Sequence, residues 1–204
     1  MQNELKILVV GPPRSGKTEL ADIISAASKG FQGKPYQPTI GTRILEFETQ
    51  VEVTGLQTNI SVQLWDTSGD EKWQMTWPAV AKGADGVMIV YNAIDENAGR
   101  LVLTYAKAFT QDLDASQVLV VAHKIGETEG KLSRPKLLKH LDQAKVIVAN
   151  AKEGLDNIND DFADFLGRVF AQKMKVIEEE EKRLIGTAAP KQKKKAKKTE
   201  EDDE

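Results

Sequence analysis

A glycine-rich segment that directly follows an apolar run could bind a polyphosphate. Residues 11–18 read G-P-P-R-S-G-K-T and follow the run Leu5–Val10. This is the G-x-x-x-x-G-K-[ST] pattern, at a point where a buried strand is followed by a helix. Glycines let the backbone wrap closely around phosphates, and the first amides of the helix direct partial positive charge at the anion. The expected phosphate-binding residues are Gly11, Pro12, Pro13, Arg14, Ser15, Gly16, Lys17 and Thr18.

Two further segments could complete a magnesium site beside this loop. Asp66 ends an apolar strand in the string W-D-T-S-G, where its carboxylate could hold Mg²⁺ through a water. Gly69, three residues later, could bring its amide to a terminal phosphate. Thr18 and Thr39 offer hydroxyl oxygens, which suit a hard cation. Thr39 lies in the loop Y-Q-P-T-I-G, and a hydroxyl that joins the metal shell only beside a γ-phosphate is a physical basis for an order–disorder switch.

The elements that must position these residues alternate between strands and helices. Short, continuous apolar runs are typical of strands that are buried on both faces. The expected strands are Leu5–Val10, Arg43–Val53, Ile60–Trp65, Gly86–Tyr91, Val118–Ala122 and Lys145–Val148, with a turn at Gly55. The expected helices between them are Glu19–Ala27, Gly99–Gln111 and Pro135–Gln143. This alternation predicts an α/β fold with a doubly wound sheet, which binds ligands beyond the carboxyl ends of its strands.

Composition narrows the class of protein. The chain has 204 residues, a formal net charge of −3 and no cysteine. Without cysteine there is no disulfide, thiolate metal site, thiol catalysis, prenylation or palmitoylation. A negative net charge gives no overall positive potential that would attract nucleic acid. No apolar stretch approaches membrane-spanning length. We therefore expect an intracellular protein with no lipid anchor of its own.

The C-terminal part differs in pattern. Apolar residues from Ile158 to Met174 recur at three- and four-residue steps, which predicts one amphipathic helix, and the charged run 178–183 continues it as a solvated extension. A lysine-rich block and then an acidic block follow Gly186. Because the acidic block can neutralise the lysines, we interpret residues 186–204 as a disordered charged tail rather than a nucleic-acid or lipid site. The expected folded domain is residues 1–185.

These motifs together resemble the Ras superfamily of small GTPases, and its Rab branch in particular. The phosphate loop, P-T-I-G, W-D-T-x-G and the strand G-A-D-G-V-M-I-V-Y stand in order at family-like spacing, and the resemblance covers roughly residues 5–175. It implies a three-layer fold with a mostly parallel six-stranded sheet and helices on both faces. It also implies GTP or GDP with Mg²⁺: phosphates on residues 11–18, Mg²⁺ on Thr18, Thr39 and Asp66, and γ-phosphate sensing by Gly69.

The base-binding side departs from the family. The usual N-K-x-D motif, whose aspartate reads guanine, is replaced by His123, Lys124, Ile125 and Gly126. Hydrogen bonds to a charged partner are worth about 1.5–3 kcal/mol each, so the loss weakens the preference for guanine. Either Glu127 or Glu129 supplies the missing carboxylate, or both are merely solvated. Asn150, Ala151 and Lys152 resemble the family's last base-contacting loop, with the Ala151 amide facing the base.

Catalysis departs as well. Asp70 occupies the position at which the family has a glutamine that orients the attacking water. A carboxylate adds negative charge beside the γ-phosphate and lacks the amide donor. Pro13 removes an N–H and crowds the space that an arginine finger would enter. We expect at most a slow GTPase.

Tryptophans near the expected switch loops are the candidate partner contacts. Trp73 and Trp77 follow Asp70, and Ile40 follows Thr39. Tryptophan is enriched at interface hot spots, although packing under a neighbouring helix is the alternative explanation.

A smaller subgroup accounts for the departures together. P-P in the phosphate loop, W-D-T-S-G-D, W-P-A, A-H-K-x-G and the missing C-terminal cysteines resemble the Rab-like subgroup of intraflagellar transport, the Rab-like-5 type. This implies docking to coiled-coil core subunits of the intraflagellar transport B complex, in the cytoplasm, the cilium or flagellum and its basal body. One alternative is a GAP-assisted, cycling GTPase in vesicle or ciliary trafficking. A second alternative is an ATP-using phosphate-loop enzyme, although the P-T-I-G and D-T-S-G segments argue against it.

Overall fold

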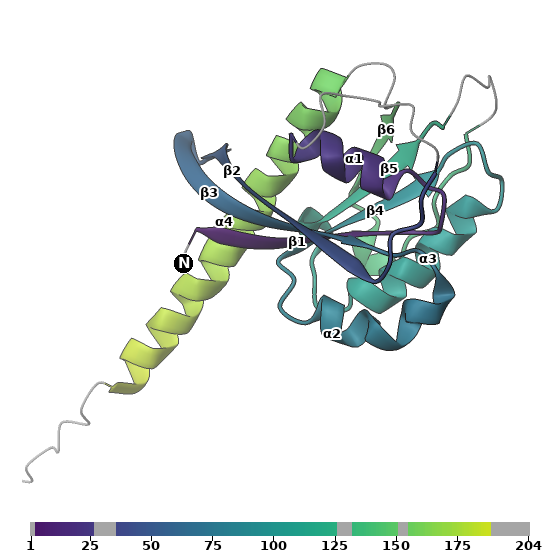
Figure 1. Ribbon diagram of the computed structural model, residues 1–204. Coiled ribbons are helices and arrows are strands. Elements are labelled where there is room, and N and C mark those ends of the chain that lie inside the picture. Colours follow the sequence, from purple (N-terminus) through teal and green to yellow (C-terminus); the bar gives the residue numbers. More distant parts are fainter. Residues whose placement is uncertain (1–2, 27–35, 126–131, 151–154, 189–204) are drawn as a thin grey trace, which may run out of the picture. The chain divides into compact units, whose positions relative to one another are not determined.

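A six-stranded sheet forms the centre of the protein (Figure 1). The structure is a computed structural model that describes residues 3–26, 36–125, 132–150 and 155–188, with the backbone alone for 155, 156 and 186–188. The strands are β1 (Glu4–Val10), β2 (Thr42–Val53), β3 (Leu56–Thr67), β4 (Gly86–Asn92), β5 (Val118–His123) and β6 (Lys145–Ala149). The helices are α1 (Lys17–Ile24), α2 (Trp77–Ala81), α3 (Ala98–Phe109) and α4 (Leu155–Ala188), with short 3₁₀ helices η1 (Glu71–Thr76), η2 (Ala115–Gln117) and η3 (Lys139–Leu141).

The strand order is β2-β3-β1-β4-β5-β6, and all neighbours are parallel except β2 and β3. Strands β4 and β5 are buried almost throughout, which explains their continuous apolar sequences. The antiparallel pair β2–β3 turns at Thr54 and Gly55, both with positive φ, as the position of Gly55 predicts. The carboxyl ends of β1 and β3 therefore lie side by side, with Val9 opposite Asp66.

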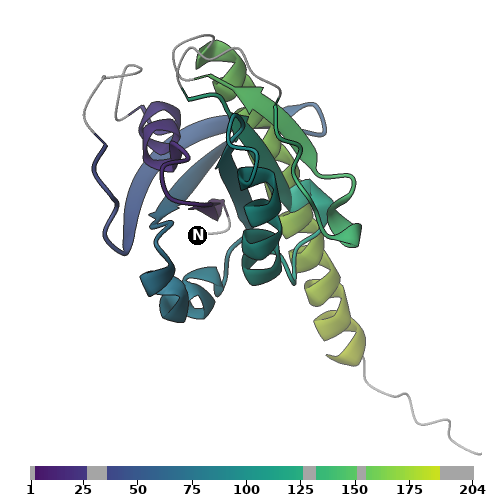
Figure 2. The ribbon, with the colours of Figure 1, turned by 90° about the vertical axis from the view of Figure 1, so that its right-hand side faces the viewer.

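Helices cover both faces of the sheet. Figure 1 shows α1 and the first turns of α4 on one side of the sheet and α2 and α3 on the other, and Figure 2 shows the same arrangement turned by 90° about the vertical axis. On the α3 side, Val102, Tyr105 and Phe109 pack into the same core as the strand residues Leu8 and Ile89. On the other side, Gly86 leaves room for Phe165 and Val169 of α4. The predicted fold class is confirmed.

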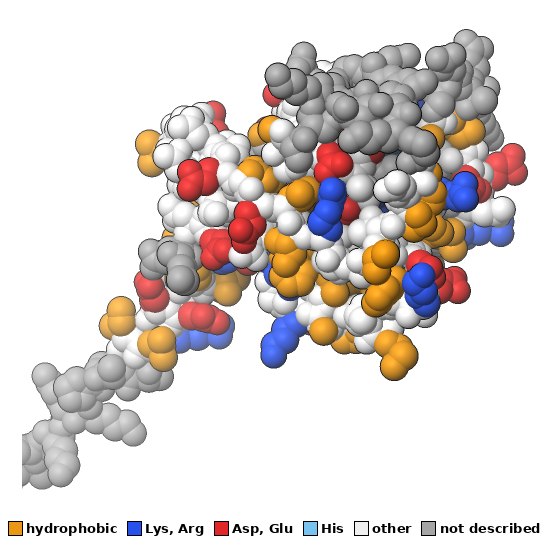
Figure 3. All heavy atoms as spheres, viewed as in Figure 1, with side chains coloured by type: hydrophobic (Ala, Val, Ile, Leu, Met, Phe, Trp, Pro, Cys, Tyr) orange, Lys and Arg blue, Asp and Glu red, His pale blue; other side chains and the backbone are white. Residues whose placement is uncertain are grey.

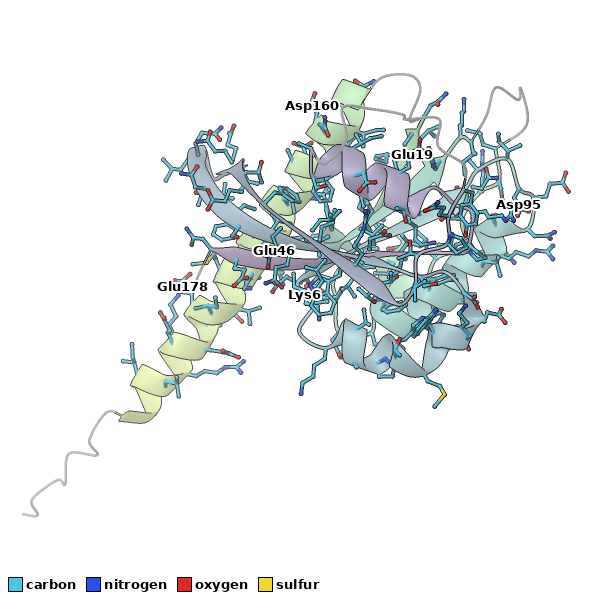
Figure 4. All side chains as sticks on the ribbon, viewed as in Figure 1. Lys6, Glu19, Glu46, Asp95, Asp160 and Glu178 are labelled. Atoms are coloured by element: carbon cyan, nitrogen blue, oxygen red, sulfur yellow. The ribbon has the colours of Figure 1, made fainter. Side chains whose placement is uncertain are left out.

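The end of α2 is tied to the sheet by Lys6, which Figure 4 labels on β1. Its ammonium donates hydrogen bonds to the carbonyls of Val80 and Lys82, both at 2.8 Å, and lies 3.9 Å from the centre of the Trp65 ring. The indole face and the two carbonyl oxygens together stabilise the Lys6 ammonium, which is partly removed from water. Lys6 thereby holds the segment that follows η1 against β3.

The predicted helix Pro135–Gln143 is wrong. Among the described residues this stretch holds only the 3₁₀ turn η3, and residues 132–138 have no regular structure. Pro135 disfavours helical geometry at Arg134. Tertiary hydrogen bonds then take the backbone amides, since the Ser133 N–H donates to the Ala93 carbonyl and the Lys136 N–H to the Gly99 carbonyl.

The chain divides into two compact units, residues 1–173 and 174–204. In the first, Lys173 near its end donates to the Glu4 carbonyl and pairs with Asp85 at 3.0 Å. In the second, the helix continues to Ala188 with an ion pair between Glu178 and Lys182 at 2.6 Å. The predicted boundary at residue 185 stays a prediction, because residues 189–204 lie outside the described part. None of the described helices has the length and apolar character to cross a membrane.

Candidate nucleotide and magnesium site

Lys17 lies inside the curve of the phosphate loop. Its ammonium donates to the carbonyls of Gly11 at 2.9 Å and Pro12 at 2.7 Å, and lies 3.5 Å from the Ser15 hydroxyl. Only 6% of the residue is exposed. Burial lowers the pKa of Lys17 to about 8, although the nearby Asp66 carboxylate opposes the shift. The loop thus presents a desolvated cation where an anion would bind.

Three predicted metal ligands from three different elements meet beside the loop. The Thr18 hydroxyl of α1 donates to Oδ2 of Asp66 at the end of β3 over 2.8 Å. The Thr39 hydroxyl lies 2.7 Å from the Thr18 hydroxyl. Because Thr18 has a single proton and gives it to Asp66, Thr39 is the donor in the second bond. The fold therefore brings into direct contact the three side chains that the sequence predicted as metal ligands.

This cluster suits a hard cation such as Mg²⁺. Oδ1 of Asp66 is buried and has no hydrogen-bond partner. Burial raises the pKa of Asp66, while the Thr18 hydrogen bond and the positive charges of Arg43 and Lys17 oppose the shift. No group of three or more His, Cys, Asp or Glu side chains that could hold a metal occurs in the described part of the chain. A cation here would need hydroxyls, water and phosphate oxygens beside one carboxylate, which is how Mg²⁺ is usually bound with nucleotides.

The segment after Asp66 packs against the phosphate loop and the Thr39 loop. The Ser68 amide donates to the Gly41 carbonyl at 2.8 Å. A Cβ atom on Gly69 would lie 2.5–2.6 Å from backbone atoms of Gly11, Pro12 and Pro13, so only glycine fits there. The Tyr105 hydroxyl of α3 donates to the Gly69 carbonyl at 3.2 Å. The D-x-x-G glycine is therefore held at the phosphate loop, where its sensing role stays a prediction.

Asp70 caps η1 instead of projecting alone into the site. Its carboxylate accepts from the Lys72 amide at 3.1 Å and pairs with the Lys72 ammonium at 2.9 Å. These contacts with Lys72 lower the pKa of Asp70. A carboxylate held by its own turn is poorly arranged to orient a water, and slow hydrolysis stays a prediction.

The imidazole of His123 packs against the phosphate loop. It ends β5, with Asn92 and Ala149 as its neighbours in the sheet. Its Nδ1 lies 3.0 Å from the Ser15 carbonyl, so Nδ1 carries the proton. The ring fills the space beside Gly16, and burial lowers the pKa of His123 against the opposing Ser15 hydrogen bond.

The rest of the predicted base-binding region is described in part. Lys124 is half-buried, and its amide donates to the Ala149 carbonyl at 2.7 Å. Gly126, Ala151 and Lys152 lie outside the described residues, as do the two alternative carboxylates, Glu127 and Glu129.

Two contacts near the phosphates were missed by the sequence reasoning, although Arg14 itself was a predicted phosphate-binding residue. The Arg14 guanidinium lies 5.0 Å from the centre of the Tyr36 ring, a cation–π contact between the phosphate loop and the segment that leads to Thr39. Arg43 of β2 pairs with Asp22 and Asp66. A positive charge four residues after Thr39 was the only available signal for Arg43, and its partners depend on strand register.

The candidate partner contacts differ in burial. Trp77 packs between Tyr105 and Phe109, with ring centres 5.2 and 5.1 Å apart, so core packing accounts for much of this side chain. Trp73 is half-buried. Ile40 is 82% exposed, and Met75 of η1, which the sequence reasoning missed, is 94% exposed. Figure 3 shows hydrophobic side chains on the surface over η1 and α2.

A phosphate loop after β1 in this strand order is the arrangement of a Ras-like small GTPase domain, and residues 6–126 match the family described as Ras of Complex, Roc, domain of DAPkinase. The Danio rerio intraflagellar transport protein 22 homolog is 34% identical over 169 residues, which cover 81% of this chain and 90% of that protein. The chain belongs to the intraflagellar transport protein 22 family.

Solved structures agree with this assignment. The GTP-bound crystal structure of T. brucei IFT22/74/81 matches with a TM-score of 0.68 and 26% identity, over 85% of this chain and 98% of that one. The GDP-bound crystal structure of T. brucei IFT22 matches with a TM-score of 0.62 and 26% identity, over 82% of this chain and 97% of that one. The resemblance to Rab-like proteins of intraflagellar transport is confirmed.

Proposed function

We propose that this chain is a GTP-binding subunit of the intraflagellar transport machinery whose nucleotide orders a docking surface. The observation that carries the proposal is the contact of Thr18, Thr39 and Asp66 beside the phosphate loop. Thr39 meets the pair formed by Thr18 of α1 and Asp66 of β3, which are distant in sequence, only when the Thr39 loop lies against the phosphate loop. A GTP-bound relative in T. brucei supports guanine nucleotide as the ligand.

In this proposal the chain's own residues divide the work. Lys17 and the loop amides would hold the phosphates, and Thr18, Thr39 and Asp66 would hold Mg²⁺, which would neutralise phosphate charge. The Gly69 amide would contact the γ-phosphate, and its segment is linked to α3 through Tyr105 and to the Thr39 loop through Gly41. Because Asp70 is engaged by Lys72, turnover is slow, and the nucleotide acts mainly as a structural ligand.

Nucleotide identification tests this function directly. Protein purified in Mg²⁺ is heated to release its ligand, and the nucleotide is identified by chromatography. We expect GTP or GDP. ATP, or no nucleotide even after incubation with GTP, would remove the guanine proposal, and ATP would favour the alternative phosphate-loop enzyme. Steady-state hydrolysis faster than about 10⁻² s⁻¹ without a partner would favour a cycling GTPase instead.

The docking surface consists of Ile40, Ile44, Trp73 and Met75. All four belong to or adjoin the Thr39 loop and η1, and Ile44 is 47% exposed. Apolar side chains exposed on nucleotide-ordered segments suit a helical partner. Since the T. brucei relative is found with IFT74 and IFT81, we propose coiled-coil subunits of that kind as partners, at the cilium or flagellum and its basal body.

Charged substitutions on this surface are expected to weaken partner capture. The double variant Ile40→Asp with Met75→Asp should lower affinity for an IFT74/IFT81-type complex by about thirtyfold or more, because even one hot-spot side chain contributes about 2 kcal/mol. Leu56→Asp is the matched control, since Leu56 is 69% exposed at the opposite end of β3. GTP binding is measured in parallel by fluorescence. Equal capture by the double variant and the control would remove this surface from the proposal.

A further inference from the structure

Arg43 connects three elements around the metal cluster. Its guanidinium lies 2.8 Å from Oδ1 of Asp22 on α1 and 3.4 Å from Oδ2 of Asp66. That second oxygen is the one to which Thr18 donates. Arg43 and Asp66 are direct cross-strand partners in the β2–β3 pair, so the strand register itself places the guanidinium beside the proposed magnesium carboxylate.

The environment makes this charge effective. The side chain of Asp66 is fully buried, whereas those of Arg43 and Asp22 are 39% and 30% exposed. Nε of Arg43 is buried and has no hydrogen-bond partner among the described residues. Arginine does not lose its proton in a protein, so the positive charge is permanent. Charges this close to a desolvated carboxylate are weakly screened.

We propose that Arg43 is a positioning residue that competes with Mg²⁺ for Asp66 and so raises the Mg²⁺ concentration that is needed to retain nucleotide. This inference rests on the proposed guanine-nucleotide function. The guanidinium holds Oδ2 of Asp66 toward Thr18 and repels a divalent cation at the same cluster. Arg43 is the second residue of β2 and follows the Thr39 loop closely, so the competition acts where that loop meets the carboxylate.

Asp22 modulates this effect. It lies closer to the guanidinium than Asp66 does, and it neutralises part of the charge. Losing Asp22 leaves Arg43 more strongly directed to Asp66, whereas losing Arg43 frees Asp66 for the cation. Both changes break the same ion pair, but they act on Mg²⁺ in opposite directions.

The test measures release of a bound fluorescent guanine nucleotide against free Mg²⁺ in EDTA-buffered solutions. Arg43→Gln is expected to lower the Mg²⁺ midpoint by about tenfold, since a unit charge facing a divalent cation at close range is worth about that factor in water. Arg43→Lys, which keeps the charge, should stay within about twofold of the original midpoint. Asp22→Asn should raise it. Arg100→Gln, an exposed arginine on α3, is the control.

The free energy of unfolding is measured separately by urea denaturation. If the ion pair were merely structural, Arg43→Gln and Asp22→Asn would both lower this free energy, and their Mg²⁺ midpoints would not shift in opposite directions. An Arg43→Gln midpoint that is unchanged or raised would overturn the inference and leave the proposed function intact. Failure of the unsubstituted protein to retain guanine nucleotide at saturating Mg²⁺ would overturn both.

Discussion

Replacing Lys17 by methionine is expected to lower the affinity for GTP and GDP by a hundredfold or more while leaving the unliganded fold intact. The ammonium is buried within hydrogen-bonding distance of the Gly11 and Pro12 carbonyls, at the place where phosphates would bind. Two hydrogen bonds from a charged donor contribute about 3–6 kcal/mol, which corresponds to roughly a hundred- to ten-thousandfold in affinity.

The unliganded protein should respond differently, because burial disfavours this charge and lowers the pKa of Lys17 to about 8. Methionine fills a similar volume without a charge to desolvate, so thermal unfolding should stay near that of the original protein. Affinity is measured by calorimetry and stability by thermal unfolding of nucleotide-free protein. Lys107→Met, an exposed lysine on α3, is the control and should change neither. A loss of affinity below about threefold would contradict the assignment of Lys17 to the phosphates.

Gly16→Ala is expected to destabilise the fold and abolish nucleotide binding, and part of the damage should depend on His123. Gly16 has φ +82°, a left-handed conformation that costs a residue with a Cβ about 1–2 kcal/mol. The added Cβ would lie 2.2 Å from Nδ1 and 2.4 Å from Cε1 of His123. The buried imidazole cannot move away without losing its hydrogen bond to the Ser15 carbonyl.

A double-mutant cycle separates the two causes. His123→Ala alone loses a buried ring and is destabilising, but in that background Gly16→Ala meets no imidazole. The combined cost should therefore be smaller than the sum by about 1–3 kcal/mol, the range found for residues in contact. Urea denaturation of the four proteins measures the coupling, and guanine-nucleotide affinity is measured on each. Additive costs would contradict the contact between His123 and the phosphate loop.

Much of the site follows from local sequence. The phosphate loop, the strand-ending Asp66 and the Thr39 loop could be predicted because each uses a residue pattern that one short backbone geometry requires. The strands could be predicted because β4 and β5 are buried on both faces and so read as continuous apolar runs. The helix expected at Pro135–Gln143 was wrong because hydrogen bonds to Ala93 and Gly99, far away in sequence, decide the backbone there.

Other features depend on contacts that no local pattern encodes. Trp77 was interpreted as a candidate partner contact, yet much of its surface packs on Tyr105 and Phe109. Met75, two residues earlier, is the more exposed side chain. Both residues are apolar and adjacent to the same loop. Only the direction in which η1 and α2 turn relative to α3 distinguishes them.

The sequence alone determined that this protein has a phosphate loop, a hydroxyl and a carboxylate for a cation, and altered residues at the water-orienting and base-reading positions. These properties depend on residue type and short spacing in the sequence, and therefore not on how the segments are arranged in the fold. The tertiary structure alone decided what the altered and unmarked residues contact: Asp70 caps η1, His123 supports Ser15 and Gly16, and Arg43 faces Asp66. The physical reason is that strand register and burial, set by the whole sheet, determine which charges and rings meet.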